Sequence, residues 1–227
     1  MTNDVRLIAD AGSSKVEWAV LFNDGSQPVR FTTPGINALM TETRELVEAF
    51  RKASENLPTS CKVSAIYYYG AGCATSAICG KISDALQSVW DGAQPYVESD
   101  MAGAARALLG REKGIAAILG TGSNSALYDG EGIIGNIPPL GFILGDEGSG
   151  TALGKRLIKE IFKGKMPEEL KETFFKEFDI SLPEILNKVY KAPAPNKFIA
   201  SLVPFIRKHI GSPFIHNMVK EEFREFF

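Results

Sequence analysis

The sequence predicts an α/β fold built from two similar lobes. A pattern of strand, polar turn, strand, glycine turn and strand occurs first over residues 7–33 and again over residues 115–134. Between the two copies, apolar strands alternate with segments of helical periodicity, which is typical of parallel βαβ units. After Gly148 the pattern is helical almost throughout. We therefore expect mixed sheets flanked by helices, with both polar turns facing a ligand cleft between the lobes.

Composition excludes several classes of protein. The 227 residues include 25 Lys and Arg against 27 Asp and Glu, a formal net charge of −2, so we expect neither nucleic acid nor an anionic membrane as a partner. The three cysteines show no C-x-x-C spacing, which argues against a disulfide framework and a zinc site. No apolar stretch is long enough to span a bilayer, and no leader pattern follows Met1. These features predict a reduced, cytoplasmic protein.

The first lobe is expected to comprise residues 1–109. Its strands are predicted from runs of β-branched and aromatic residues, and its helices from apolar spacing. The expected strands are residues 7–9, 16–22, 29–33, 63–69 and 95–98. The expected helices are residues 39–57, residues 75–90 and a segment that begins after Asp100.

The second lobe is expected to comprise residues 110–227, with a helical insertion after Gly148. Its predicted strands are residues 115–119, 125–128 and 132–134. Prolines punctuate the helical part and set the limits of its segments. The predicted helices are residues 150–162, 168–178, 182–189, 196–209 and 214–227.

Each polar turn could bind a phosphate. Residues 10–15 (Asp-Ala-Gly-Ser-Ser-Lys) have small side chains that let backbone N–H groups approach phosphate oxygens, and the Asp10 carboxylate could hold Mg²⁺. Residues 120–123 (Gly-Thr-Gly-Ser) offer amides and hydroxyls in the same way. They form neither a Walker A loop nor a Rossmann fingerprint. Taken alone, the first turn is explained equally well as an ordinary hairpin in which Asp10 caps the backbone.

Two further segments carry acids at places suited to chemistry. Asp100 stands between a predicted strand and a helix, where it could accept the proton of a hydroxyl nucleophile; without context a helix N-cap is its simpler role. Residues 141–150 combine four glycines with the adjacent acids Asp146 and Glu147. Carboxylates and glycine amides together suit sugar hydroxyls, although the same acids could cap the helix that follows.

In this order, the motifs resemble those of N-acetylglucosamine kinases and the related BadF/BadG-type ATPases. The resemblance covers most of the N-terminal two thirds of the family's pattern. It implies the two-lobed, ribonuclease-H-like fold of the superfamily that contains acetate and sugar kinases and actin, that is, an actin-like ATPase fold. The function that it implies is ATP-dependent phosphorylation of the 6-hydroxyl of N-acetylglucosamine or a related amino sugar.

The resemblance also implies a role for each motif, with ATP and Mg²⁺ as cofactors. The first phosphate motif, whose carboxylate would also bind the metal, consists of Asp10, Gly12, Ser13, Ser14 and Lys15. The second phosphate motif consists of Gly120, Thr121, Gly122 and Ser123. The base that activates the sugar hydroxyl would be Asp100. The residues implied to line the sugar pocket are Asn37, Asn124, Gly141, Asp146 and Glu147. Asn37 is equally expected as a turn residue.

The sequence departs from the family pattern at three places. Ala11 replaces a common glycine, and Phe142 stands where tryptophan is frequent. The chain also ends at Phe227 without the family's glycine-rich adenosine motif, so we expect an incomplete C-terminal lobe.

Two alternative functions and the oligomeric state stay open. One alternative is an ATPase that activates a 2-hydroxyacyl-CoA dehydratase, whose iron–sulfur cluster would need cysteines in a glycine-rich context that Cys61, Cys73 and Cys79 do not match. The other is a non-catalytic sugar-binding sensor. A homodimer is compatible with the sequence, which does not fix the number of subunits.

Overall fold

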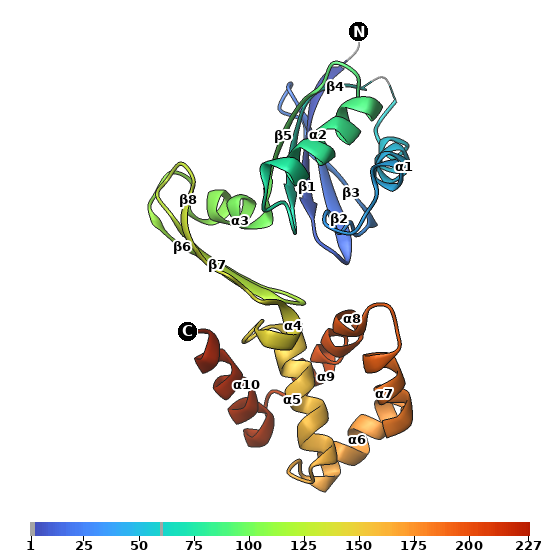
Figure 1. Cartoon of the computed structure of the whole chain (residues 1–227), viewed down its shortest axis with the longest axis vertical. Coiled ribbons are helices and arrows are strands. Elements are labelled where there is room, and N and C mark those ends of the chain that lie inside the picture. The colour runs from blue at the N-terminus through green and yellow to red at the C-terminus, as the bar shows by residue number, and fades with distance from the viewer. Residues whose placement is uncertain (1–2, 60) are drawn as a thin grey trace. The chain divides into compact units, whose positions relative to one another are not determined.

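The computed structural model describes residues 3–59 and 61–227, and Figure 1 shows its helices and strands. Internal contacts divide the chain into two compact units. The first comprises Met1–Ala116 and Leu127–Ile134, and the second comprises Ala117–Ala126 and Gly135–Phe227. The sequence predicts a lobe boundary between residues 109 and 110 because the strand pattern starts again there. This boundary stays a prediction.

A five-stranded mixed sheet forms the centre of the first unit. Its strands are β1 (Asn3–Ala11), β2 (Lys15–Phe22), β3 (Val29–Pro34), β4 (Cys61–Gly70) and β5 (Gln94–Ser99). They lie in the order β3-β2-β1-β4-β5. The pairs β1/β2 and β2/β3 are antiparallel, whereas β1/β4 and β4/β5 are parallel. An antiparallel meander extended by two parallel strands is the ribonuclease-H-like arrangement that the sequence predicts.

The core of this unit is an aromatic cluster between the sheet and two adjacent helices, α1 (Thr43–Ser54) and α2 (Ser76–Val89). Trp18 of β2 packs edge-on against Phe50 of α1 and Tyr68 of β4, with ring centroids 6.2 and 6.4 Å apart. All three side chains are buried. Burial raises the pKa of the Tyr68 hydroxyl well above its usual value. The alternation of buried and exposed residues along β2 therefore fixes which face of the sheet receives the helices.

The helix predicted over residues 39–57 is shorter, because α1 begins at Thr43 and ends at Ser54. Residues 37–41 form a turn instead. The Asn37 side chain accepts a hydrogen bond from the Leu39 N–H (3.1 Å), and its backbone carbonyl accepts one from the Thr41 N–H (2.9 Å). Such a local side-chain bond competes with helix formation. The turn role that the sequence left open for Asn37 is thus present.

Three consecutive strands follow α3 (Asp100–Leu109): β6 (Gly114–Leu119), β7 (Ser123–Tyr128) and β8 (Ile133–Ile137), in that order across a second sheet. Their short connections require antiparallel neighbours. One helix was not predicted: α4 (Gly141–Leu144) is a single turn between two glycines. Leu140 before it has a left-handed φ of 55°. Apolar spacing does not predict such a backbone conformation.

The rest of the second unit is helical, as predicted. Its helices are α5 (Gly150–Phe162), α6 (Glu168–Phe178), α7 (Leu182–Tyr190), α8 (Pro195–Ala200), α9 (Val203–Lys208) and α10 (Pro213–Phe226). They enclose a core around the fully buried Leu157, Phe174 and Phe205. The single helix predicted over residues 196–209 is two helices, because Pro204 has no N–H to donate to the preceding turn. Throughout the described ranges, no helix combines the length and the apolar character that crossing a membrane requires.

Candidate functional site

In the first unit, backbone hydrogen bonds hold the hairpin turn that follows β1. The Gly12 N–H donates to the Lys15 carbonyl (3.0 Å), and the Ile36 N–H donates to the Gly12 carbonyl (3.2 Å). Gly35 approaches the turn so closely that a Cβ there would lie 2.4 Å from the Ser13 carbonyl. The segment after β3 therefore supports the turn from one side, and a glycine is required at the point of contact.

The predicted acids of this unit gather at one edge of the sheet. Because β1, β4 and β5 are parallel, their carboxyl ends meet there, with Asp10 beside Tyr69 and Gly70 beside Ser99 in the register. Asp100 follows directly after β5. The edge outside the carboxyl ends of parallel strands is where open α/β sheets bind ligands.

The surroundings of Asp100 suit a proton acceptor. Ser99, not Asp100, caps α3, since its hydroxyl accepts the Ala102 N–H (3.3 Å); the N-cap role left open for Asp100 is therefore wrong. One Asp100 oxygen accepts the Met101 N–H (2.9 Å). Burial raises the pKa of Asp100 above its ordinary value, the Met101 bond opposes this, and the nearby Asp10 carboxylate adds to the rise.

Asp10 and Lys15, at the two ends of the turn, are exposed. The Asp10 carboxylate makes no hydrogen bond or ion pair with the described residues, which leaves it open to a cation. The Lys15 ammonium pairs with Glu17 two residues along β2. This contact raises the pKa of Lys15 and lowers that of Glu17, so Lys15 stays a cation beside the turn.

In the second unit, the turn between β6 and β7 lies on the first residues of α5. The Gly150 N–H donates to the Gly120 carbonyl (2.8 Å), and the Thr151 N–H donates to the Thr121 carbonyl (3.1 Å). The N–H groups of Thr121 and Gly122 have no acceptor among the described residues. Two free amides beside the positive end of a helix form an arrangement that favours anions.

Sequence reasoning missed the hydroxyls that hold this arrangement. Ser149 is the N-cap of α5: its Oγ accepts the Ala152 N–H (3.2 Å) and lies 2.9 Å from the Thr151 Oγ. Both side chains are fully buried. A serine directly before a helical pattern could have indicated such a cap. Neither acid of residues 146–147 caps α5, so that alternative for them is wrong.

The Asp146 carboxylate lies against the same turn. Asp146 is buried and has a left-handed φ of 61°. Its Oδ1 accepts the Ser123 N–H (3.3 Å), and a Cβ on Gly122 would lie 2.8 Å from its Oδ2. Burial raises the pKa of Asp146, which the Ser123 bond and the Lys155 charge partly offset.

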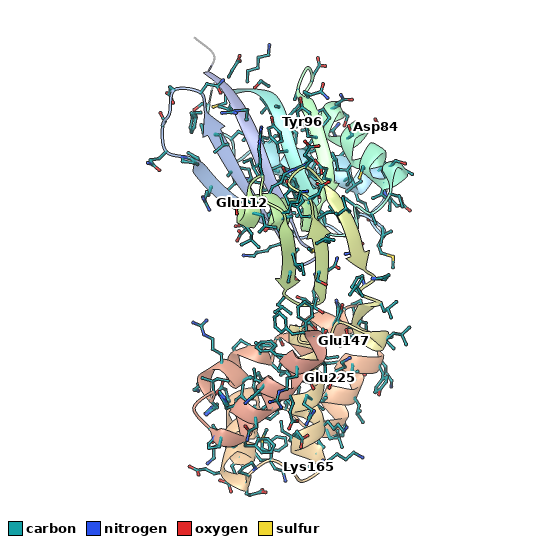
Figure 2. The ribbon with its side chains drawn as sticks, turned by 90° about the vertical axis from the view of Figure 1, so that its left-hand side faces the viewer. Asp84, Tyr96, Glu112, Glu147, Lys165 and Glu225 are labelled. Carbon is teal, nitrogen blue, oxygen red and sulfur yellow. The ribbon has the colours of Figure 1, made fainter. Side chains whose placement is uncertain are left out.

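The other predicted sugar-binding residues lie apart from this contact. The Asn124 side-chain oxygen on β7 accepts the Asn136 amide (2.9 Å) and the Ser125 N–H (2.9 Å). Gly141 begins α4 with a φ of 74°. Glu147, labelled in Figure 2, is exposed and has no hydrogen bond among the described residues. The first unit thus contains Asp10, Gly12, Ser13, Ser14, Lys15, Asn37 and Asp100. The second contains Gly120, Thr121, Gly122, Ser123, Asn124, Gly141, Asp146 and Glu147.

No protein-family model matches the chain, and no curated protein matches it either. A solved structure from Porphyromonas gingivalis, named "Putative N-acetylglucosamine Kinase", is 43% identical to it over 97% of this chain and 78% of the other, with a TM-score of 0.90. This chain belongs to the N-acetylglucosamine kinase and BadF/BadG-type ATPase family. The resemblance seen in the motifs is therefore confirmed over nearly the whole chain.

More distant structures share the fold of this family. A second "Putative N-acetylglucosamine Kinase", from Chromobacterium violaceum, is 17% identical, with a TM-score of 0.73 over 99% of this chain and 81% of the other. A regulator of the ROK family, described as a homologue of an E. coli protein, is 12% identical, with a TM-score of 0.54 over 98% of this chain and 70% of the other. The actin-like ATPase fold class predicted from the sequence is confirmed.

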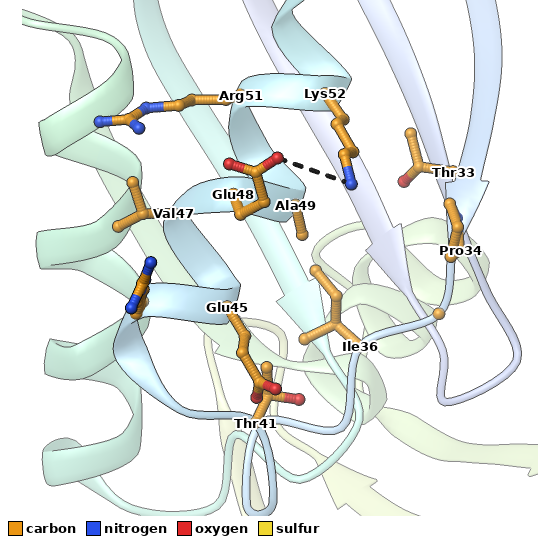
Figure 3. A pocket seen from close by; sticks show the side chains of 12 residues that line it. Thr33, Pro34, Ile36, Thr41, Glu45, Val47, Glu48, Ala49, Arg51 and Lys52 are labelled. Atoms are coloured by element: carbon orange, nitrogen blue, oxygen red, sulfur yellow. Dashed lines mark ion pairs between the residues drawn. The ribbon is translucent and has the colours of Figure 1, made fainter.

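A hollow of about 750 Å³ is lined in part by Gly35, the glycine that contacts the turn of residues 10–15. Figure 3 shows it between α1 and the segment of residues 33–36, with Ile36 and Ala49 in its middle. The Glu48–Lys52 ion pair (3.5 Å) stands on the α1 side. None of the predicted site residues lines the hollow. No sequence pattern predicts this hollow, because apolar spacing identifies α1 but not the space beside the loop.

Proposed function

We propose that this protein is a sugar kinase that transfers the terminal phosphoryl group of Mg-ATP to the 6-hydroxyl of N-acetylglucosamine or a related amino sugar. The observation that carries the proposal is the environment of the Asp100 carboxylate. Its carboxylate is partly buried, carries a raised pKa beside a second acid, and is not the cap of α3. The family membership of the chain supports the same reaction class.

Asp100 would accept the proton of the sugar hydroxyl as that oxygen attacks phosphorus. A carboxylate whose pKa is raised binds this proton more strongly than a free aspartate does, which suits a general base. The Met101 N–H bond fixes one carboxylate oxygen, so the other oxygen is left for the substrate. Phosphoryl transfer needs little more acid–base chemistry than this, because positioning and charge neutralisation supply most of the acceleration.

The two turns would hold the phosphates. In the first unit the N–H groups of Ser13 and Ser14 have no acceptor among the described residues, whereas the Gly12 N–H donates to the Lys15 carbonyl and shapes the turn. The Lys15 ammonium is near by. In the second unit the free N–H groups of Thr121 and Gly122 would donate to phosphate oxygens. Backbone donors held by surrounding hydrogen bonds need no rearrangement when the anion binds.

The exposed Asp10 carboxylate fits a hard cation such as Mg²⁺, which takes one or two carboxylates together with phosphate oxygens and water. No group of three or more His, Cys, Asp or Glu residues within the described part of the chain could hold a metal on its own. Asp10 would therefore hold the ion in company with the nucleotide. When bound, Mg²⁺ neutralises charge on the phosphates.

For the sugar we propose Asn37, Asn124, Gly141, Asp146 and Glu147. The side-chain oxygens of Asn37 and Asn124 accept hydrogen bonds within the protein, but their NH₂ groups donate to no described residue and could donate to hydroxyl or acetamido oxygens. Glu147 is exposed and free to accept hydrogen bonds. Asp146 offers the oxygen that Ser123 does not occupy.

The experiment that tests this function is ADP release from Mg-ATP with and without N-acetylglucosamine. We expect release that depends on the sugar and is abolished by Asp100→Asn, with sugar binding retained. The matched control is Asp84→Asn, an exposed acid on α2 (Figure 2), which should change nothing. Sugar binding without ADP release would favour the sugar-sensor alternative. ADP release at the same rate with and without the sugar would contradict the proposed kinase activity.

A further inference from the structure

The last helix, α10, packs against the segment that precedes α5. Gly148 is buried, with a left-handed φ of 69°. A Cβ on it would lie 3.0 Å from the Phe226 Cβ and 3.3 Å from the Phe223 Cδ1. Both phenylalanines belong to α10. The side chains of α10 therefore lie in van der Waals contact with the backbone at Gly148.

One arginine anchors α10 to α5. The Arg156 guanidinium contacts Glu221 (2.8 Å) and Glu222 (3.4 Å) of α10 and Glu160 (2.9 Å) of its own helix. Glu160 is buried, and its second oxygen has no partner in the described part of the chain. Because one cation serves three carboxylates, removing it would leave the buried Glu160 charge uncompensated.

Gly148 connects this anchored helix to the proposed phosphate turn. It lies between Asp146, whose carboxylate accepts the Ser123 N–H, and Ser149, whose N–H donates to the Asp146 carbonyl (3.2 Å). The next amide, that of Gly150, donates to the Gly120 carbonyl (2.8 Å). A displacement at Gly148 would therefore move hydrogen-bond partners on both ends of the turn.

We propose that Phe223 and Phe226 are positioning residues for nucleotide binding, acting through Gly148 on the turn of residues 120–123. The inference rests on the proposed function, since it names the nucleotide phosphates as what the turn receives. The two side chains touch neither substrate nor cofactor. They fix the segment of residues 146–150 and so keep the free amides of Thr121 and Gly122 in place.

The test compares Phe223→Ala, which deletes the ring atom that lies over Gly148, with Tyr190→Ala, which removes an exposed aromatic ring from the end of another helix. Small misplacements of binding groups cost up to about a hundredfold in catalysis. For Phe223→Ala we expect Mg-ATP binding weakened by about tenfold. Hydrogen exchange at the Ser123 and Gly150 amides should become faster. Tyr190→Ala should change none of these.

Two further variants distinguish a local effect at this contact from unfolding of the whole protein. Phe223→Leu keeps an apolar side chain at the contact and should restore most of the nucleotide affinity. Arg156→Lys keeps the charge but cannot serve three carboxylates, so it should loosen α10 and accelerate exchange at the same amides.

These measurements test the proposed kinase activity and the proposed role of α10 separately. Unaltered exchange at Ser123 and Gly150 in folded Phe223→Ala would overturn the role of α10, even if the protein is a sugar kinase. Absence of sugar-dependent ADP release by the unaltered chain would instead contradict the proposed kinase activity. The amide exchange would still decide whether α10 positions the turn.

Discussion

The Asp146 carboxylate lies so close to Gly122 that a Cβ at Gly122 would be 2.8 Å from its Oδ2. The same carboxylate accepts a hydrogen bond from the next residue, Ser123. A residue expected to face the sugar therefore also holds the turn expected to receive phosphate. This contact gives a physical reason for a glycine at position 122 that turn geometry alone does not give.

Gly122→Ala should distort the turn. The new methyl group would overlap a carboxylate that is fixed by burial and by Ser123, so either the turn or residue 146 must shift. We expect a loss of about 1–3 kcal/mol in the free energy of unfolding and a higher KM for Mg-ATP. Enzyme kinetics and urea unfolding would measure both. Gly132→Ala is the control, because a Cβ there meets nothing within 4 Å; equal effects of the two changes would contradict the prediction.

The sequence predicts the local elements of this region better than their contacts. Helix α5 begins and ends at the residues predicted, 150 and 162, because apolar spacing along a helix is a local signal. The contact of Gly122 with Asp146 joins residues on separate elements, and no periodicity encodes it. Similarly, residues 39–41 belong to a turn held by Asn37 where apolar spacing predicted helix, since the spacing ignores the competing side-chain hydrogen bond.

Asp100 should make the stability of the fold depend on pH. Its pKa is raised in the folded protein, chiefly by burial. Between the ordinary pKa and the raised one, the folded state binds more protons than the unfolded chain, so the free energy of unfolding decreases as pH rises through that window. Above that window the cost of burying the carboxylate charge therefore destabilises the fold.

The variant Asp100→Asn removes this charge and keeps an oxygen for the Met101 N–H. We expect a higher Tm than that of the unaltered protein at neutral pH, and a smaller difference near pH 3, together with a loss of turnover of about 10²- to 10⁴-fold. Thermal unfolding at both pH values measures the first effect. A lower Tm at neutral pH would show that the carboxylate stabilises the fold instead.

Ser149→Ala should weaken the start of α5. The fully buried hydroxyl accepts the Ala152 N–H and lies beside the Thr151 hydroxyl, and an alanine leaves both without this partner. Loss of such a cap costs about 1–2 kcal/mol of unfolding free energy, and the KM for Mg-ATP should rise because the turn rests on this end of the helix. Chemical unfolding is the measurement, and Ser76→Ala, at an exposed position of α2, is the control. Loss of stability without any change in nucleotide affinity would separate the cap from the phosphate turn.

Two glycine-to-alanine changes should act in opposite directions. At Gly154 a Cβ would lie 2.2 Å from the Ile199 carbonyl, because α5 and α8 approach closely there. Gly154→Ala must push these helices apart, so we expect a loss of about 1–3 kcal/mol or more. At Gly80, inside α2, a Cβ meets nothing within 4 Å, so Gly80→Ala should gain roughly 0.5–1 kcal/mol from helix propensity alone. Urea unfolding of both variants checks the pair, and a stable Gly154→Ala would show that the two helices are not packed backbone to backbone.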